Sequence, residues 1–152
     1  MTICDVASHS GGSWGESGRI IYATFEPPHQ GALWQIAADG GVPERLDTES
    51  NGEHTYSWPQ LLPGDEHILV TARASEEAYG TSVVAVHRET GKEQVILDRA
   101  SYGRYVPSGH LLFGIAGNLW AQPFDASRAR PLGEAVQVLE QVVMDPGDGS
   151  GQ

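Results

Sequence analysis

The residues best suited to chemistry in this sequence are its six histidines, because imidazole can bind a metal or carry a proton near neutral pH. They are His9, His29, His54, His67, His87 and His110. No two of them lie within five residues of each other, whereas protein metal sites commonly use local pairs of ligands. The sequence therefore predicts neither a metal site nor a cofactor.

Side chains that could act as nucleophiles also lack the sequence setting of a catalytic group. Ser13, Ser57 and Ser108 do not lie in a Gly-x-Ser-x-Gly turn. Cys4 is the sole cysteine, which excludes an intrachain disulfide and a cysteine-based zinc cluster. Residues 145–150 offer oxygen ligands for calcium but lack the later Glu of a calcium-binding loop. We therefore expect no catalytic residue and no enzymatic activity in this chain.

The amino-acid composition limits which kinds of partner this protein can bind. Nine Lys and Arg against 20 Asp and Glu give a net charge of −11, and such a surface repels phosphate backbones and anionic lipids. The longest apolar runs are far shorter than the ~20 residues of a membrane-spanning helix. Nucleic-acid binding and membrane insertion are therefore not expected. The 19 Gly and 9 Pro point to many turns and to all-β structure.

The elements that must position any functional residue repeat along the chain. An aromatic residue, a turn rich in Gly, Pro, Ser or Asp, and an apolar run occur together three times, at residues 13–22, 57–70 and 104–113. The apolar runs begin 48 and 43 residues apart, and short apolar runs bounded by turns are typical of buried strands. A period of roughly 40–50 residues with four strands is typical of a β-propeller blade.

We therefore predict an all-β fold: a β-propeller fragment of three four-stranded antiparallel blades with a stray strand at each end. An antiparallel sandwich with similar hairpins is the alternative. Within residues 1–152, the blades are expected at about 11–48, 53–98 and 101–139, the outer strand of a preceding blade at 1–7, and the first strand of a following blade at 141–144. Trp14, Trp34, Trp58, Trp120, Ile21, Leu69, Val84, Leu112 and Phe113 are expected to be largely buried between blades.

The repeats resemble the TolB-like β-propeller repeat, a WD40-like architecture. The matching stretches are 13–22, Leu33-Trp34 with residues 39–41, 58–63, 109–113 and 119–125. They are most similar to propellers that follow bacterial serine/threonine protein kinases on the C-terminal side, although the kinase motifs themselves are absent. The resemblance implies a soluble bacterial protein of the cytoplasm or periplasm, and a ring of six or more blades.

Two functions fit this fold. The first is a non-catalytic binding module whose loops hold a protein or peptide. The alternative is a segment of a propeller-containing peptidase or hydrolase, in which the channel gates or binds substrate. Loops before the innermost strands lie near a propeller's central channel, so Glu53, His54 and Tyr102 are the candidate ligand-binding residues.

Three blades cannot close a ring. Two apolar blade faces would remain uncovered, and exposed faces of that kind usually mark an interface. Two copies would supply six blades around a two-fold axis. We therefore expect a homodimer that approximates a six-bladed ring, with residues 1–7 placed to pair across the junction; the alternative is a truncated chain that stays monomeric or aggregates.

Overall fold

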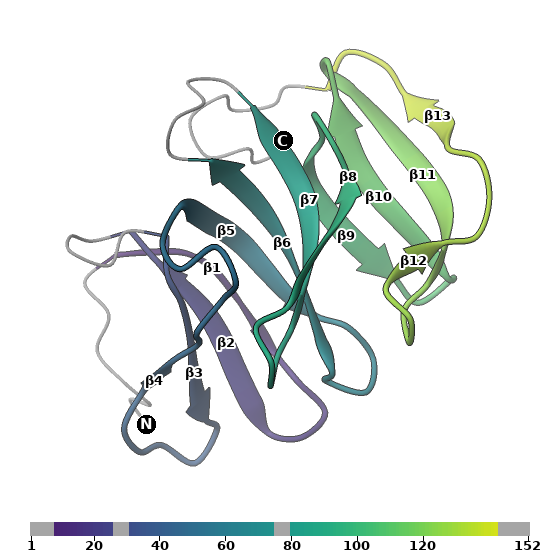
Figure 1. Cartoon of the computed structure of the whole chain (residues 1–152). Helices are drawn as coiled ribbons and strands as arrows, with labels where there is room; N and C mark the ends of the chain where they lie inside the picture. The colour runs from purple at the N-terminus through teal and green to yellow at the C-terminus, as the bar shows by residue number, and fades with distance from the viewer. Residues whose placement is uncertain (1–7, 26–30, 75–79, 143–152) are drawn as a thin grey trace.

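In the computed structural model, which describes residues 8–25, 31–74 and 80–142, every regular element is a strand (Figure 1). No helix that could cross a membrane occurs in these ranges. The strands are β1 (His9–Trp14), β2 (Arg19–Thr24), β3 (Leu33–Ala37), β4 (Glu44–Arg45), β5 (His54–Leu61), β6 (His67–Ala74), β7 (Thr81–His87), β8 (Glu93–Leu97), β9 (Ser101–Val106), β10 (His110–Ile115), β11 (Asn118–Asp125), β12 (Arg130–Pro131) and β13 (Val136–Leu139).

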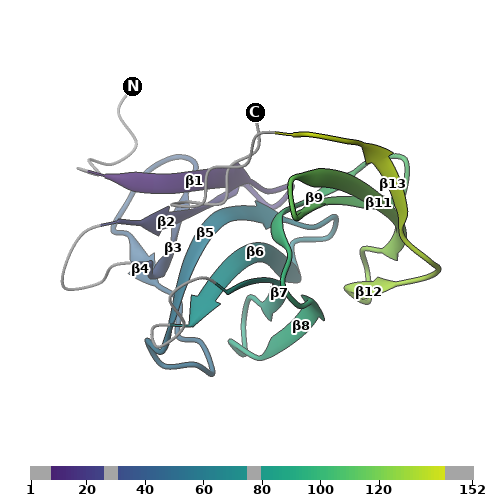
Figure 2. The same cartoon turned by 90° about the horizontal axis from the view of Figure 1, so that it is seen from above.

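The strands form three antiparallel sheets, as the sequence predicts. Blade 1 has the order β1-β2-β3-β4, blade 2 the order β5-β6-β7-β8, and blade 3 the order β9-β10-β11-β12, with β13 also paired to β11. Figures 1 and 2 show the blades side by side in chain order. The stray strand expected at 1–7 lies outside the described residues. Half of the one expected at 141–144 also lies outside them; the other half, Gln141 and Val142, is described and is not strand.

Each blade opens with the same tight turn between its first two strands. The turn includes a residue with a left-handed backbone just before the second strand, at Gly18 (φ 73°), Asp65 (φ 57°) and Gly109 (φ 81°). Glycine adopts this conformation at little cost, and Asp tolerates it better than most side chains do. The Gly-rich turns noted in the sequence therefore set the hairpins that start each blade.

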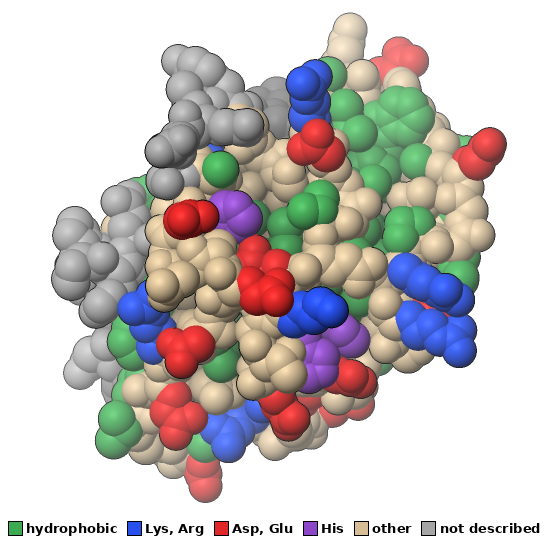
Figure 3. Space-filling view, viewed as in Figure 1, with side chains coloured by type: hydrophobic (Ala, Val, Ile, Leu, Met, Phe, Trp, Pro, Cys, Tyr) green, Lys and Arg blue, Asp and Glu red, His purple; other side chains and the backbone are tan. Residues whose placement is uncertain are grey.

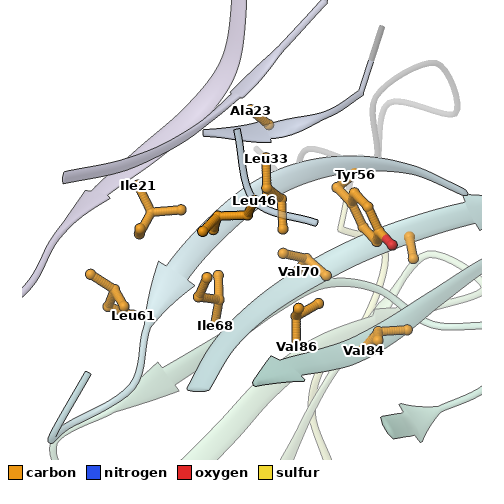
Figure 4. Packing of buried hydrophobic residues seen from close by; sticks show 11 residues of the cluster. Ile21, Ala23, Leu33, Leu46, Tyr56, Leu61, Ile68, Val70, Val84 and Val86 are labelled. Atoms are coloured by element: carbon orange, nitrogen blue, oxygen red, sulfur yellow. The ribbon is translucent and has the colours of Figure 1, made fainter. Parts of the chain in front are cut away.

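Blades 1 and 2 meet across an apolar layer that we call junction 1–2. Ile21, Ala23 and Leu33 of blade 1 pack against side chains from β5, β6 and β7 of blade 2 (Figure 4). The blade 2 members are Tyr56, Leu61, Ile68, Val70, Ala72, Val84 and Val86. Successive strand residues point to opposite faces, so β6 turns Ile68 and Val70 toward blade 1 and the residue between them toward blade 3.

Blades 2 and 3 meet across a second layer, junction 2–3, built around Phe113, which is 1% exposed. Leu69, Val83 and Ala85 of blade 2 face Leu111 and Phe113 of β10. Because β6 and β7 contribute to both layers, blade 2 is apolar on both faces. Its β6 and β7 strands accordingly read as continuous apolar runs rather than alternating ones.

The core expectations are partly wrong. Ile21, Leu69, Val84 and Phe113 are buried as predicted, whereas Trp34, Trp58, Trp120 and Leu112 are only partly buried. Trp14 is 66% exposed, because β1 ends at this residue and its side chain lies at the end of the sheet rather than between blades. The aromatic repeat position is therefore not a uniform core position.

Blade 3 departs from the four-strand plan at its outer edge. The connection after Asp125 contains β12, whose Arg130 and Pro131 pair with Asp125 and Phe124 of β11. β13 pairs with the other half of β11, from Leu119 to Ala121. Two short strands thus share one edge, a pairing that sequence periodicity does not reveal.

Candidate functional site

A pocket of 440 Å³ lies where the innermost strands of all three blades end. It is lined by Trp14, Gly15 and Glu16 of blade 1, by Tyr105 and Pro107 of blade 3, and between them by residues of blade 2: Gln60, Leu61, Leu62, Pro63 and Asp65. Sites where several structural units meet are common places for ligands. This pocket is therefore the candidate site.

Asp65 fixes the blade 1 side of the pocket. Its carboxylate accepts hydrogen bonds from the backbone N–H of Ser17 (2.6 Å) and of Glu16 (3.2 Å). Burial opposes ionisation of this side chain, but the hydrogen bonds from Ser17 and Glu16 and the nearby Arg88 outweigh it, so its pKa lies below the usual value. A side chain at Gly15 would clash with this carboxylate, since its Cβ would lie 2.5 Å from both oxygens.

Gln60 fixes the blade 3 side of the pocket. Its side-chain amide donates to the carbonyl oxygen of Tyr105 (3.0 Å) and accepts from the backbone N–H of the same residue (2.8 Å). The amide thus extends the hydrogen bonding of β9 across the gap between two sheets. Since both sides are held by backbone contacts, the rim of the pocket is preformed, which lowers the entropic cost of binding.

Two pocket residues remain available to a ligand. The Trp14 ring is largely exposed, and the Glu16 side chain is exposed as well. Neither side chain forms a hydrogen bond or ion pair with another described residue. A large aromatic surface beside a free carboxylate can bind an apolar or cationic group.

The predicted residue His54 lies in a different place, in a network centred on Glu93. One oxygen of Glu93 lies 2.9 Å from His54 Nδ1, and the other accepts from the Tyr56 hydroxyl (2.6 Å) and the Ser50 N–H (3.0 Å). Burial and Glu93 raise the pKa of Tyr56. Burial opposes ionisation of Glu93, but the hydrogen bonds from Tyr56, Ser50 and His54 outweigh it and lower its pKa. This network ties the segment between blades 1 and 2 to β8.

The other two predicted residues do not join His54. Glu53 is exposed, and its N–H closes a turn onto the carbonyl of Ser50. Tyr102 lies on β9, where its ring meets the Trp58 ring edge-on at 5.8 Å and the Arg104 guanidinium lies 5.1 Å above it. Tyr102 and Trp58 both have left-handed backbones, at register shifts in β9 and β5. Within the described ranges no hydrogen bond or ring contact joins Tyr102 to His54 or Glu53.

His67, His87 and His110 lie at the ends of strands in the middle of their sheets. His67 and His110 each begin the second strand of their blade. His67 lies opposite His87 on β7 with ring centroids 5.3 Å apart, and burial lowers the pKa of His67. Within the described residues no group of three or more His, Cys, Asp or Glu converges in a way suited to a metal ion.

Sequence reasoning missed the pocket because it treated Trp14 as core. The sequence repeats align Trp14 with Trp58, whereas the strand register places Trp14, paired with Ile20, at the position that Leu61, paired with Ile68, holds in blade 2. Gln60 and Asp65 carry no motif of their own, since their roles depend on blades that are distant in sequence.

Comparison with protein-family models gives no match, and comparison with curated proteins gives none either. Solved β-propellers are similar in structure. The propeller domain of the Trilobed protease from Pyrococcus furiosus matches with a TM-score of 0.63 at 13% identity over 91% of this chain. The Dos1 propeller matches with a TM-score of 0.62 at 8% identity over 92%.

An oligogalacturonate lyase, solved in complex with manganese, matches with a TM-score of 0.59 at 11% identity over 92% of this chain. The chain spans 45%, 40% and 43% of the lengths of the protease propeller, the Dos1 propeller and the lyase. At these identities the likeness concerns the fold alone. The chain therefore has the fold of part of a β-propeller.

Proposed function

We propose that this chain is a non-catalytic binding module whose three-blade pocket holds a segment of a protein or peptide. The observation that carries the proposal is the exposed Trp14 at the rim of a pocket whose walls are held by Asp65 and Gln60. Aromatic side chains that are exposed on a rigid surface are frequent energetic centres of protein interfaces. The TolB-like character of the repeats belongs to the same proposal and is supported by the repeat residues.

Selection from a random peptide library displayed on phage tests the proposal, with the purified chain as bait. Peptides that enrich are synthesised and their affinities measured by calorimetry. Truncation of Trp14 to Ala should weaken binding by about tenfold or more, the loss expected for a central interface aromatic. Val42 is 84% exposed and does not line the pocket, so Val42→Ala is the matched control and should leave the affinity unchanged.

Two outcomes would contradict the proposal. Selection could yield no peptide, or the peptides could bind Trp14→Ala as tightly as the unaltered chain. A further check uses turnover: hydrolysis of peptide or glycoside substrates that persists through purification and is abolished by His54→Ala would favour the alternative, a segment of a propeller enzyme.

For the assembly we propose a homodimer that approximates a six-bladed ring. Blade 3 exposes apolar side chains at its outer edge, where Figure 3 shows hydrophobic surface gathered over β10–β13; they are Leu132, Val136, Val138 and Leu139, each 46–61% exposed. Exposed apolar patches of this kind usually mark an interface. Two copies would also supply roughly the length of the solved propellers that each copy spans by 40–45%.

Light scattering on the purified chain tests the dimer. The proposal predicts a mass of about twice 16.3 kDa. Replacing Val136 and Val138 with Lys should shift the mass toward one copy, while the same replacement at Val42 serves as a control for added charge. A folded species at 16.3 kDa would contradict the dimer.

A further inference from the structure

We propose that the three-blade pocket selects a cationic side chain, Lys or Arg, presented by the bound peptide. This inference rests on the proposed binding function and names the chemistry of the ligand. It follows from the charge of the pocket lining, from the hydrogen bonds that occupy one of its two carboxylates, and from the aromatic surface beside the other.

The lining of the pocket is acidic. Its ten residues include Glu16 and Asp65 and no Lys or Arg, in a chain whose net charge is −11. Arg88 contacts a lining residue: its Nε donates to the carbonyl oxygen of Asp65 (2.8 Å), and its terminal nitrogens face Gln35 and Glu89. Arg104, next to Tyr105 in the chain, donates to the carbonyl oxygen of Pro59 (3.5 Å) and lies over the Tyr102 ring. Both arginines are thus already engaged, and neither lines the pocket.

The two carboxylates differ in their availability. Asp65 is 4% exposed, and both its carboxylate oxygens accept hydrogen bonds from backbone N–H groups. Its carboxylate therefore holds the wall of the pocket in place and is not available to a ligand. The side chain of Glu16 is exposed and has no hydrogen bond or ion pair with a described residue. The backbone N–H of Glu16 is nevertheless held by Asp65. The backbone of Glu16 is therefore fixed in position, while its side-chain carboxylate is available to a ligand.

Trp14 provides the second group that would contact a Lys or Arg side chain. It lies two residues before Glu16 and lines the same pocket, and Trp is the side chain that binds cations best through its ring face. A carboxylate and an indole together favour a cation that also has an apolar stem, which describes Lys and Arg. Leu61, Leu62 and Pro63 offer apolar contact for that stem.

The test uses four pools of acetylated, amidated heptapeptides without Trp, degenerate except for a central Arg, Lys, norleucine or Glu. Binding is followed through the Trp14 indole signal in nitrogen-15 NMR spectra. The Arg and Lys pools should perturb this signal at concentrations about three- to tenfold lower than the norleucine pool, the range that an exposed cation–π contact plus an ion pair supports. The Glu pool should be the weakest.

Glu16→Gln should remove most of the preference for Arg over norleucine, whereas the exposed control Glu134→Gln should retain it. Equal binding of the Arg and norleucine pools, or an Arg preference that survives Glu16→Gln, would overturn the cation inference while leaving peptide binding intact. If no pool moves the Trp14 signal, the cation inference and the proposed binding site both fail.

Discussion

The two junctions of this molecule bury similar apolar layers but differ in the polar groups that border them. At junction 1–2 two carboxylates accept bordering hydrogen bonds, Asp65 from the turn of blade 1 and Glu93 from the segment between the blades. Neutral hydrogen bonds accompany them there, such as the one from the Leu61 N–H to the Ser13 hydroxyl (3.0 Å). At junction 2–3 the bordering hydrogen bonds end on neutral groups, the Gln60 amide and the Thr71 hydroxyl, which contact the backbone of Tyr105 and Tyr102.

The apolar layers and the hydrogen bonds that border them therefore have different roles. Apolar burial stabilises both junctions in the same way, since the hydrophobic effect is not directional. The hydrogen bonds fix how each pair of innermost strands is aligned, and the pocket is bordered by one of each kind. Charged hydrogen bonds are stronger than neutral ones but depend on the ionisation of the acceptor. Junction 1–2 should therefore respond to pH, and junction 2–3 should not.

The largest expected effect removes the apolar layer of one junction. Phe113→Ala should lower the free energy of unfolding by about 3–5 kcal/mol, because a fully buried aromatic is lost and a cavity remains. Chemical denaturation measures the change. Val42→Ala is the control at an exposed position outside the proposed dimer interface and should cost less than about 0.5 kcal/mol. Equal losses for the two variants would contradict the packing of junction 2–3.

The next effect removes one charged acceptor from junction 1–2. Glu93→Gln should cost about 1–3 kcal/mol of unfolding free energy, because Tyr56, Ser50 and His54 all lose their carboxylate partner. Glu134, which is exposed, gives the control Glu134→Gln. A Glu93 variant as stable as the control would show that the carboxylate does not hold the segment between the blades.

Acidification should separate the two junctions without mutation. Asp65 and Glu93 have folded pKa values below the usual ones, so their contribution to stability is complete above the unfolded values of about 3.9 and 4.3 and is lost as pH falls through the folded values. Amide hydrogen exchange between about pH 6 and pH 3, corrected for intrinsic rates, measures it. The Ser17 and Ser50 amides should lose protection before those of Tyr102 and Tyr105. Simultaneous loss of amide protection at both junctions would contradict the proposed difference in their pH dependence.

The smallest effect concerns the pocket rim. Trp14→Ala should change the free energy of unfolding by less than about 0.5 kcal/mol, because the ring is 66% exposed and supports neither apolar layer. Thermal denaturation compares it with the unaltered chain. A loss of several kcal/mol would mean that the ring is part of the core after all, and binding data on that variant would then reflect unfolding.

Sequence reasoning recovered the architecture because the hairpin turns and apolar runs are local signals. Gly18, Asp65 and Gly109 mark the turns, and the spacing of the runs identifies the blades. It failed for Trp14, since burial depends on where a strand ends relative to the neighbouring sheets. The candidate site could not be predicted from local sequence signals, because Asp65 acts through Ser17, 48 residues away, and Gln60 acts through Tyr105, 45 residues away.

The most direct test of the central claim is a crystal structure of the chain with a selected peptide bound. The account predicts that the peptide lies across the ends of β1, β5 and β9, with one side chain against Trp14 and a basic group beside Glu16. A peptide bound along the β13 edge, or on the opposite face of the blades, would contradict the assignment of the pocket as the functional site.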